Sequence, residues 1–415
     1  MKFLLLNQFF APDSAPTGQL LADVAREIVA RGHHADVVSA RAAYAGAASG
    51  QAPPQGVRIL HTPCLPFGHG ARARLLSYAS YYAGALWHSF RASDCDVVVT
   101  MTTPPLLSLV GTVLKKLCGV RHYIWEMDLY PDIAVALGML SSGSVLARAW
   151  ERVANYSRRN ADGVIVLGPC MRERVLRAGV PAARVHIAEN WADGALVRPR
   201  PFPPPRPLVV LYSGNLGLPH DIHTIAAAID DLKEDEGIRF VFAGGGARRR
   251  ELEDLCRSRA ISTVSWQPYE TWERLGAHLA ACHVGLVMQT PASLGTLVPG
   301  KIYALMAAGR PLLFIGPRQA TAARIIERFG CGWQVNAGDS AGLVDLLRTL
   351  AVSPEMAIQA GARARRAFIA NYDLPAGVSA VLEVFGIGTR RTPRRPAMSS
   401  VGRTGKPVSA RTLSA

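Results

Sequence analysis

The sequence predicts two α/β domains of similar size, joined by a proline-rich linker. Short apolar segments alternate with helical segments along most of the chain, a pattern typical of parallel sheets covered by helices. The alternation stops at RPRPFPPPRP, residues 198–207, where prolines are too dense for a helix or a central strand. It resumes at Leu208. We therefore divide the chain into residues 1–197, the linker 198–207, a second domain at 208–386 and a basic tail at 387–415.

The first domain opens with a strand, a turn-rich loop at Ala11–Gly18 and a helix. Its predicted strands are Phe3–Leu6, Ala35–Ser39, Val57–His61, Asp96–Thr100, Arg121–Trp125, Gly163–Leu167 and Val185–Ala188. Its predicted helices are Gln19–Arg31, Arg72–Arg91, Pro104–Cys118, Leu146–Arg159 and Met171–Ala178. The loop after the first strand is where α/β folds bind ligands. It lacks G-x-G-x-x-G, so no dinucleotide fingerprint is present there.

The helix Arg72–Arg91 combines aromatic and apolar residues with basic ends. This composition suits an amphipathic helix at a membrane interface. A helix packed in the core has much the same composition and is the commoner case. Membrane contact is therefore the weaker of the two hypotheses for this segment.

The second domain repeats the same alternation after the linker. Its predicted strands are Leu208–Tyr212, Arg239–Ala243, Val264–Trp266, Val284–Met288, Leu312–Ile315 and Trp333–Val335. Helices are expected at Ile222–Leu232, from Ala247 onward, within Leu297–Pro311 and, as the last one, at Glu355–Asn371. Two such domains place a ligand in the cleft between them.

Composition indicates a globular protein, with 49% hydrophobic residues, 38 Gly and 28 Pro in 415 residues. Seven cysteines without a C-x-x-C pair favour reduced, mostly buried thiols in a cytoplasmic protein. The sequence has no apolar stretch of about 18 residues, so we predict no transmembrane helix. We also expect no signal peptide, because the first ten residues run into Pro and Asp without a cleavage site.

The net charge of +15 is concentrated at one end of the chain. Residues 387–415 contain six Arg, one Lys and no acid, so this tail supplies +7. Its polar composition predicts disorder. Such a tail attracts anionic lipid or nucleic acid, but a solvated tail is the simpler interpretation, and we expect no nucleic-acid partner.

Three glycine turns of the second domain each follow a strand and precede a helix: SGNLG at 213–217, AGGG at 243–246 and PGK at 299–301. They should meet at one edge of the sheet, where backbone N–H groups can approach phosphate oxygens. Lys301 lies in the first turn of its helix, where a cation is unfavourable unless an anion is bound. We therefore predict a diphosphate site. Its residues are Gly214, Asn215, Gly244, Gly245, Gly246, Gly300 and Lys301. No Walker pattern occurs, which disfavours kinase or ATPase chemistry.

Two further groups of polar residues are candidate sites. EMDLYPD places Glu126, Asp128 and Asp132 just past the strand Arg121–Trp125, where helix capping and a role at the binding edge are equally plausible. His220 and His223 have HxxH spacing, but no third ligand stands out, so we predict no metal site.

Five segments spread along the chain form a recognisable set: NQFFAPDSAPTG at 7–18, DLYPDIAVALGML at 128–140, YSGNLG at 212–217, FAGGG at 242–246 and VPGKIYALMAAGRPLLFIG at 298–316. In their order and spacing they resemble glycosyltransferase family 4. The resemblance is greatest to the colanic-acid branch of envelope polysaccharide biosynthesis. It implies the GT-B fold, in which two Rossmann-like domains face each other across a central cleft.

The resemblance also implies an activity: transfer of a sugar from a nucleotide-sugar to an acceptor, with retention at the anomeric carbon. The acceptor would be a lipid-linked saccharide of exopolysaccharide, capsule or O-antigen synthesis, bound by the N-terminal domain at the cytoplasmic membrane face. Gly18 would approach the donor, and Glu126 or Asp128 would act on the acceptor hydroxyl. Lys301 and the glycine turns would stabilise the leaving diphosphate, with no metal or other cofactor required.

The chain departs from the family pattern at two places. Thr296 and Ala304 occupy the positions of the usual paired glutamates, and Asn215 with the His220–Asp221 region replaces the usual Arg and Lys. Donor binding must therefore differ from the common pattern. Two alternatives remain open: a nucleotide-sugar epimerase with the same layout, and a basic protein that binds membranes or nucleic acid.

Overall fold

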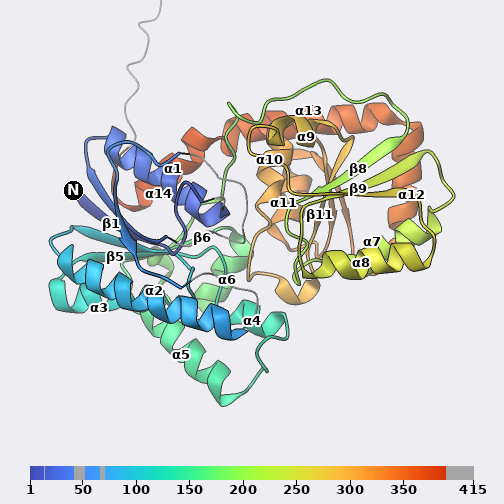
Figure 1. Ribbon diagram of the computed structural model, residues 1–415. Helices are drawn as coiled ribbons and strands as arrows, with labels where there is room; N and C mark the ends of the chain where they lie inside the picture. Colours follow the sequence, from blue (N-terminus) through green and yellow to red (C-terminus); the bar gives the residue numbers. More distant parts are fainter. Residues whose placement is uncertain (14, 42–51, 66–70, 389–415) are drawn as a thin grey trace, which may run out of the picture.

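The computed structural model describes residues 1–388 except 14, 42–51 and 66–70, and the predicted tail therefore lies almost wholly outside the described residues. Two α/β domains lie side by side, each with a central sheet covered by helices (Figure 1). Residues 198–207 between them form neither helix nor strand. No helix of the described residues is long and apolar enough to span a bilayer.

The N-terminal sheet has seven parallel strands in the order β3-β2-β1-β4-β5-β6-β7. They are β1 (Lys2–Leu6), β2 (His34–Ala40), β3 (Arg58–Thr62), β4 (Val97–Thr100), β5 (Arg121–Trp125), β6 (Gly163–Val166) and β7 (Val185–Ile187). All seven predicted strands are confirmed. Most of them read as continuous apolar runs because both faces of a parallel sheet are buried.

Helices cover both faces of this sheet. They are α1 (Pro16–Ala30), α2 (Ala71–Arg91), α3 (Ser108–Cys118), α4 (Asp132–Ala136), α5 (Val145–Asn160) and α6 (Pro169–Arg177). The helix predicted from Pro104 begins only at Ser108. Leu106 has a φ of 69°, which is incompatible with a right-handed helix.

The C-terminal sheet has six parallel strands in the order β10-β9-β8-β11-β12-β13. They are β8 (Leu208–Ser213), β9 (Ile238–Ala243), β10 (Val264–Gln267), β11 (Val284–Met288), β12 (Leu312–Ile315) and β13 (Gly332–Val335). The helices are α7 (Ile222–Asp231), α8 (Ala247–Ser258), α9 (Leu275–Ala280), α10 (Lys301–Ala307), α11 (Thr321–Phe329), α12 (Ser340–Val352), α13 (Pro354–Asn371) and α14 (Leu374–Val384). The six predicted strands are confirmed.

The last helix crosses back to the N-terminal domain, where α14 packs on α1 (Figure 1). Phe385 just beyond it lies against Phe3 and Tyr123, with ring centroids 6.0 and 5.2 Å apart. The prediction that Glu355–Asn371 ends the helical structure is wrong. The predicted second domain runs to residue 386, whereas α14 and Phe385 pack with the first. Asp373 caps α14 by accepting a hydrogen bond from the Leu374 N–H at 2.9 Å.

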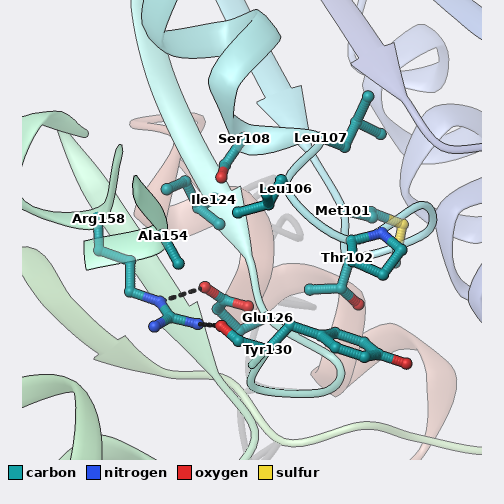
Figure 2. A pocket seen from close by; sticks show the side chains of 11 residues that line it. Met101, Thr102, Leu106, Leu107, Ser108, Ile124, Glu126, Tyr130, Ala154 and Arg158 are labelled. Atoms are coloured by element: carbon teal, nitrogen blue, oxygen red, sulfur yellow. Dashed lines mark hydrogen bonds and ion pairs between the residues drawn. The ribbon is translucent and has the colours of Figure 1, made fainter. Parts of the chain in front are cut away.

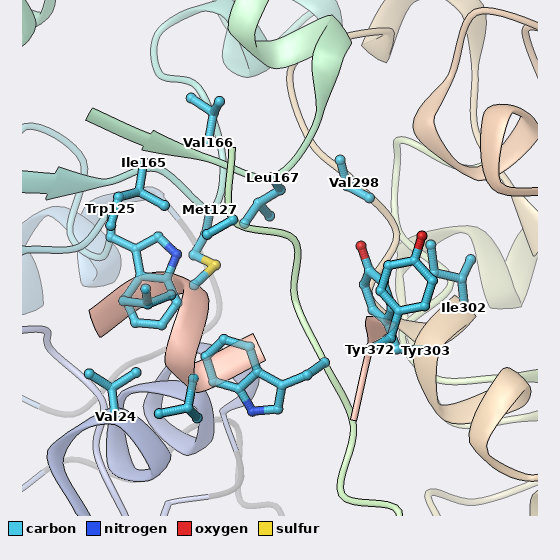
Figure 3. Packing of buried hydrophobic residues seen from close by; sticks show 14 of the residues in the cluster. Val24, Trp125, Met127, Ile165, Val166, Leu167, Val298, Ile302, Tyr303 and Tyr372 are labelled. Atoms are coloured by element: carbon cyan, nitrogen blue, oxygen red, sulfur yellow. The ribbon is translucent and has the colours of Figure 1, made fainter. Parts of the chain in front are cut away.

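One hydrophobic core extends through both domains. Figure 3 shows part of it, with Trp125, Met127 and Leu167 on the N-terminal side and Val298, Ile302, Tyr303 and Tyr372 on the C-terminal side. Trp125 stacks on Trp191 at 5.9 Å, and Tyr303 packs on Tyr372 at 5.2 Å. The two domains are therefore held in contact by buried side chains as well as by the linker.

Candidate active site

The first two glycine turns interlock at the carboxyl edge of the C-terminal sheet. The Gly214 N–H donates to the Ala243 carbonyl at 2.8 Å, and the Leu216 N–H to the Gly245 carbonyl at 2.6 Å. A Cβ on Gly244 would overlap the Gly214 carbonyl oxygen, and both glycines have φ near +120° (126° and 119°). The packing of one turn on the other therefore requires glycine, whatever the turns bind.

Lys301 joins the third turn to the first. It is the first residue of α10, and Gly309 beyond that helix has the predicted left-handed conformation, with φ 70°. The buried Nζ of Lys301 has no hydrogen-bond partner among the described residues. It lies 3.4 Å from the centroid of the Tyr212 ring in β8. Burial lowers the pKa of Lys301 well below its usual value.

The electron-rich face of the Tyr212 ring lies against this ammonium and partly offsets its charge. A buried cation without an anion is costly, and an anionic ligand would remove that cost. The surroundings of Lys301 therefore favour the binding of a negatively charged ligand. Its Cε and Nζ are both 3.8 Å from where a Cβ on Gly214 would stand, so the glycine also keeps the approach to it open.

Gly300 differs from the other predicted donor-binding glycines. Its φ of −65° is open to any residue, and nothing lies within 4 Å of the position of an added Cβ. The fold does not require glycine here. Gly300 is exposed, and the space around it is open.

Two aromatic residues near the turns were not predicted as site residues. Tyr269 is 56% exposed, and its ring lies 3.1 Å from the Cβ positions of both Gly244 and Gly245. His220 lies edge-on to Tyr212, with centroids 5.6 Å apart. Burial first, and then the charge of Lys301, lower the pKa of His220 to about 3, so it is neutral. Both placements depend on tertiary contacts that the sequence does not display.

Glu126 forms a buried ion pair with Arg158. Its Oε1 accepts a hydrogen bond from Nε of Arg158 at 2.8 Å, and both side chains are buried. Arg158 also donates to the Tyr130 carbonyl, again at 2.8 Å (Figure 2). The pair fixes the shape of the loop that follows β5. Arg158 lies in α5, and spacing alone could not reveal it as the partner.

Asp128 lies where this acidic loop meets the segment leading to Lys301. It forms an isolated antiparallel bridge with Leu297, and the Leu129 N–H donates to the Thr296 carbonyl at 2.8 Å. Burial first, and then the neighbouring Glu126, raise the pKa of Asp128 to about 6. The structure thus brings the predicted acidic loop and the predicted Lys301 turn into direct contact.

The third acid of the loop, Asp132, strengthens the same junction. It pairs with Arg174 of α6 at 3.1 Å, and Arg174 also donates from Nε to the Leu294 carbonyl at 3.0 Å. Leu294 precedes the Lys301 turn. Asp132 therefore has a role in the contact between the domains.

Gly18 and Thr296 are both enclosed by protein. Gly18 lies in the first turn of α1, where a Cβ would come within 3.1 Å of the Phe9 and Phe10 backbone. The Thr296 hydroxyl donates to the Ser293 carbonyl at 2.8 Å and is buried. At the usual glutamate positions this chain thus offers an internally bonded hydroxyl and, at Ala304, a methyl group. Among the described residues, no three His, Cys, Asp or Glu side chains group as metal ligands.

The class of protein follows from the fold. Two Rossmann-like domains with contacting carboxyl edges, and a basic glycine-rich site on the second, define the GT-B architecture. Solved structures share it: sucrose-phosphate synthase of Thermosynechococcus elongatus matches with a TM-score of 0.75, at 18% identity over 93% of this chain and 98% of that one. HepE of Anabaena, solved with UDP and glucose, matches with a TM-score of 0.70, at 15% identity over 93% and 99%.

Sequence comparison gives the family. Residues 17–191 match a glycosyl transferase 4-like domain, and residues 207–352 match the glycosyl transferases group 1. The probable glycosyltransferase WbjE of Pseudomonas aeruginosa is 30% identical over 72% of this chain and 78% of its own. The putative colanic acid biosynthesis glycosyl transferase WcaI of Escherichia coli K12 is 24% identical over 79% and 86%. The chain belongs to glycosyltransferase family 4, and it is a GT-B glycosyltransferase.

Proposed function

We propose that this glycosyltransferase transfers a sugar, with retention of configuration, from a nucleotide-sugar to a lipid-linked saccharide of envelope polysaccharide synthesis. The observation that carries the proposal is the buried Nζ of Lys301, which has no anionic partner among the described residues. A nucleoside diphosphate supplies the missing negative charge. The UDP complex of the structural neighbour HepE supports this choice of ligand class.

The leaving diphosphate would bind between Lys301 and the turns at Gly214 and Gly300. Negative charge develops on the diphosphate as the bond from the sugar breaks, and a fixed cation beside it lowers the barrier. Lys301 and backbone N–H groups would do this without a metal. Departure of the diphosphate from the face that the acceptor hydroxyl attacks gives retention.

Asp128 would act on the acceptor. Its pKa, raised to about 6, lies close to neutral pH, where a general base is most effective. Glu126, held by Arg158, would position the loop that carries Asp128. The sequence leaves open which of the two acids acts on the acceptor. We assign proton transfer to Asp128 and positioning of the loop to Glu126.

The names of the relatives support the place of the reaction. The name of WcaI assigns it to colanic acid biosynthesis. We therefore propose that this chain also acts on an envelope polysaccharide acceptor. We propose that this acceptor is carried on lipid and that the enzyme works in the cytoplasm at the inner face of the membrane.

The decisive variant is Lys301→Ala. We expect turnover to fall by roughly 10²-fold or more, because the cation that meets the developing charge is lost. Arg250→Ala, an exposed cation in α8, is the control and should leave turnover unchanged. Unchanged kinetics in the Lys301 variant would remove the basis of the proposal.

Donor class and reaction type are separated by two simple measurements. UDP, GDP and dTDP should differ in how far they raise the melting temperature, because only a ligand of the native state stabilises it. Donor incubated without acceptor should remain intact as a sugar, and its conversion to an epimer would instead identify an epimerase. NMR of the product shows whether the anomeric configuration is retained.

A further inference from the structure

Helix α2 is built the opposite way round from an ordinary surface helix. Its buried face consists of two serines, one alanine and one tyrosine: Ser77, Tyr81, Ala85 and Ser89. The large apolar residues face outward: Leu75, Leu76, Leu86, Trp87 and Phe90 are between 37% and 67% exposed. Ala79 and Ala83, also exposed, connect them at helical spacing into one continuous stripe.

Specific contacts fix this orientation. The Tyr81 hydroxyl donates to the Val38 carbonyl at 2.9 Å, and Nε2 of Gln8 donates to the Ser77 hydroxyl at 3.0 Å. Gly84 packs so closely on Thr62 that a Cβ would not fit. Rotating the helix to bury its apolar stripe would break all three contacts. The stripe is therefore held outward by the fold.

The segment that carries the stripe has charges of one sign. The sequence contains no Asp or Glu between Asp36 and Asp94, whereas α2 itself contains three arginines. One of them, Arg91, holds its guanidinium 5.0 Å from the centroid of the exposed Trp87 ring. Tryptophan beside arginine is the pairing that suits the boundary between hydrocarbon and anionic headgroups.

We propose that the exposed face of α2 docks the enzyme on an anionic lipid bilayer, with the helix lying in the plane of the interface. The inference rests on the proposed function, because it supplies the surface through which a lipid-linked acceptor is reached. Ser77, near the N-terminal end of α2, contacts Gln8, which follows β1 at the carboxyl edge of the sheet. The docked helix thus leads from the bilayer to the edge that carries Asp128.

The test compares two double variants by sedimentation with vesicles. Leu76→Glu/Trp87→Glu places two charges on the stripe, whereas Val352→Glu/Ile369→Glu places them on equally exposed apolar residues of the C-terminal domain. With vesicles of phosphatidylcholine and phosphatidylglycerol, the wild type and the control should bind alike. The α2 variant should bind about tenfold more weakly or worse. All three proteins keep the basic tail, so any difference belongs to the helix.

Two results would overturn the docking proposal. One is equal vesicle binding by the α2 variant and the wild type. The other is light scattering that shows a wild-type dimer and a monomeric α2 variant, since the stripe would then pair two copies of the chain.

A separate measurement keeps this inference distinct from the proposed function. The nucleoside diphosphate that raises the melting temperature of the wild type most should raise that of the α2 variant equally, because the stripe lies outside the donor site. Vesicle binding without any response to nucleotide would leave docking intact and refute the donor proposal. A response to nucleotide without wild-type vesicle binding would do the reverse.

Discussion

At the scale of single residues, two carboxylates that are neighbours in sequence have been given different environments. Glu126 is buried with Arg158, and Asp128 has no ion-pair partner among the described residues. Burial first, and then the neighbouring Glu126, raise the pKa of Asp128. This difference separates a positioning residue from a candidate for proton transfer. The sequence shows both acids and cannot show which one Arg158 reaches.

The raised pKa of Asp128 predicts a pH dependence. If the carboxylate form accepts the acceptor proton, kcat/KM should fall as the pH drops through about 6. The same raised pKa affects stability. Between about pH 4 and about pH 6, the native state keeps a proton on Asp128 that the unfolded state has released. The contribution of Asp128 to the free energy of unfolding therefore decreases as the pH rises through this range. Asp128→Asn should abolish the acidic limb of the activity profile. An unchanged limb in that variant would assign it to another group.

At the scale of elements, the strands could be predicted almost completely and the turns only in part. Buried parallel strands such as Val97–Thr100 are continuous apolar runs, so their sequence alone marks them. The place of Lys301 in the first turn of α10 was also visible in the sequence, where a cation conflicts with the helix dipole. Tyr269 and His220 were not, since each gains its place only when separate turns pack together.

The glycine turns give a matched pair of variants. Gly244→Ala forces a φ of 119° on a residue with a side chain and overlaps the Gly214 carbonyl, so we expect a loss of about 1–3 kcal/mol in the free energy of unfolding. Gly300→Ala should change it by less than about 0.5 kcal/mol, because the space is open. Urea unfolding measures both. If the two variants are equally stable, the turns do not interlock as described.

Gly300→Ala also reports on the donor. If the diphosphate binds beside the Gly300 turn, the added methyl group should weaken binding of the preferred nucleoside diphosphate while leaving stability intact. Unaltered binding would place the diphosphate elsewhere on the sheet edge.

At the scale of the whole molecule, the chain passes twice between its domains. The first passage is the linker 198–207, where Arg310 donates to the carbonyls of Arg200 and Pro201 at 3.0 and 2.9 Å. The second follows α13 and delivers α14 to the N-terminal domain. The linker was evident from its prolines. The return was not, because α14 has no local feature that shows on which domain it packs.

Phe385 tests the importance of the second passage. Phe385→Ala should lower the free energy of unfolding by about 3–5 kcal/mol, because the ring is fully buried against Phe3 and Tyr123. Ile369→Ala, at an exposed position of α13, should have little effect. A small effect of both substitutions would mean that α14 contributes little to the N-terminal core.

The return of α14 also has a consequence for the order in which the protein can fold during synthesis. Domains generally fold as units, starting from the N-terminus as the ribosome releases the chain. Here the strands that carry Phe3 and Tyr123 emerge early, but the ring that covers them is made almost at the end. The first domain to be synthesised is therefore the last to be completed, and its uncovered face must be kept from aggregating until the second domain has been made.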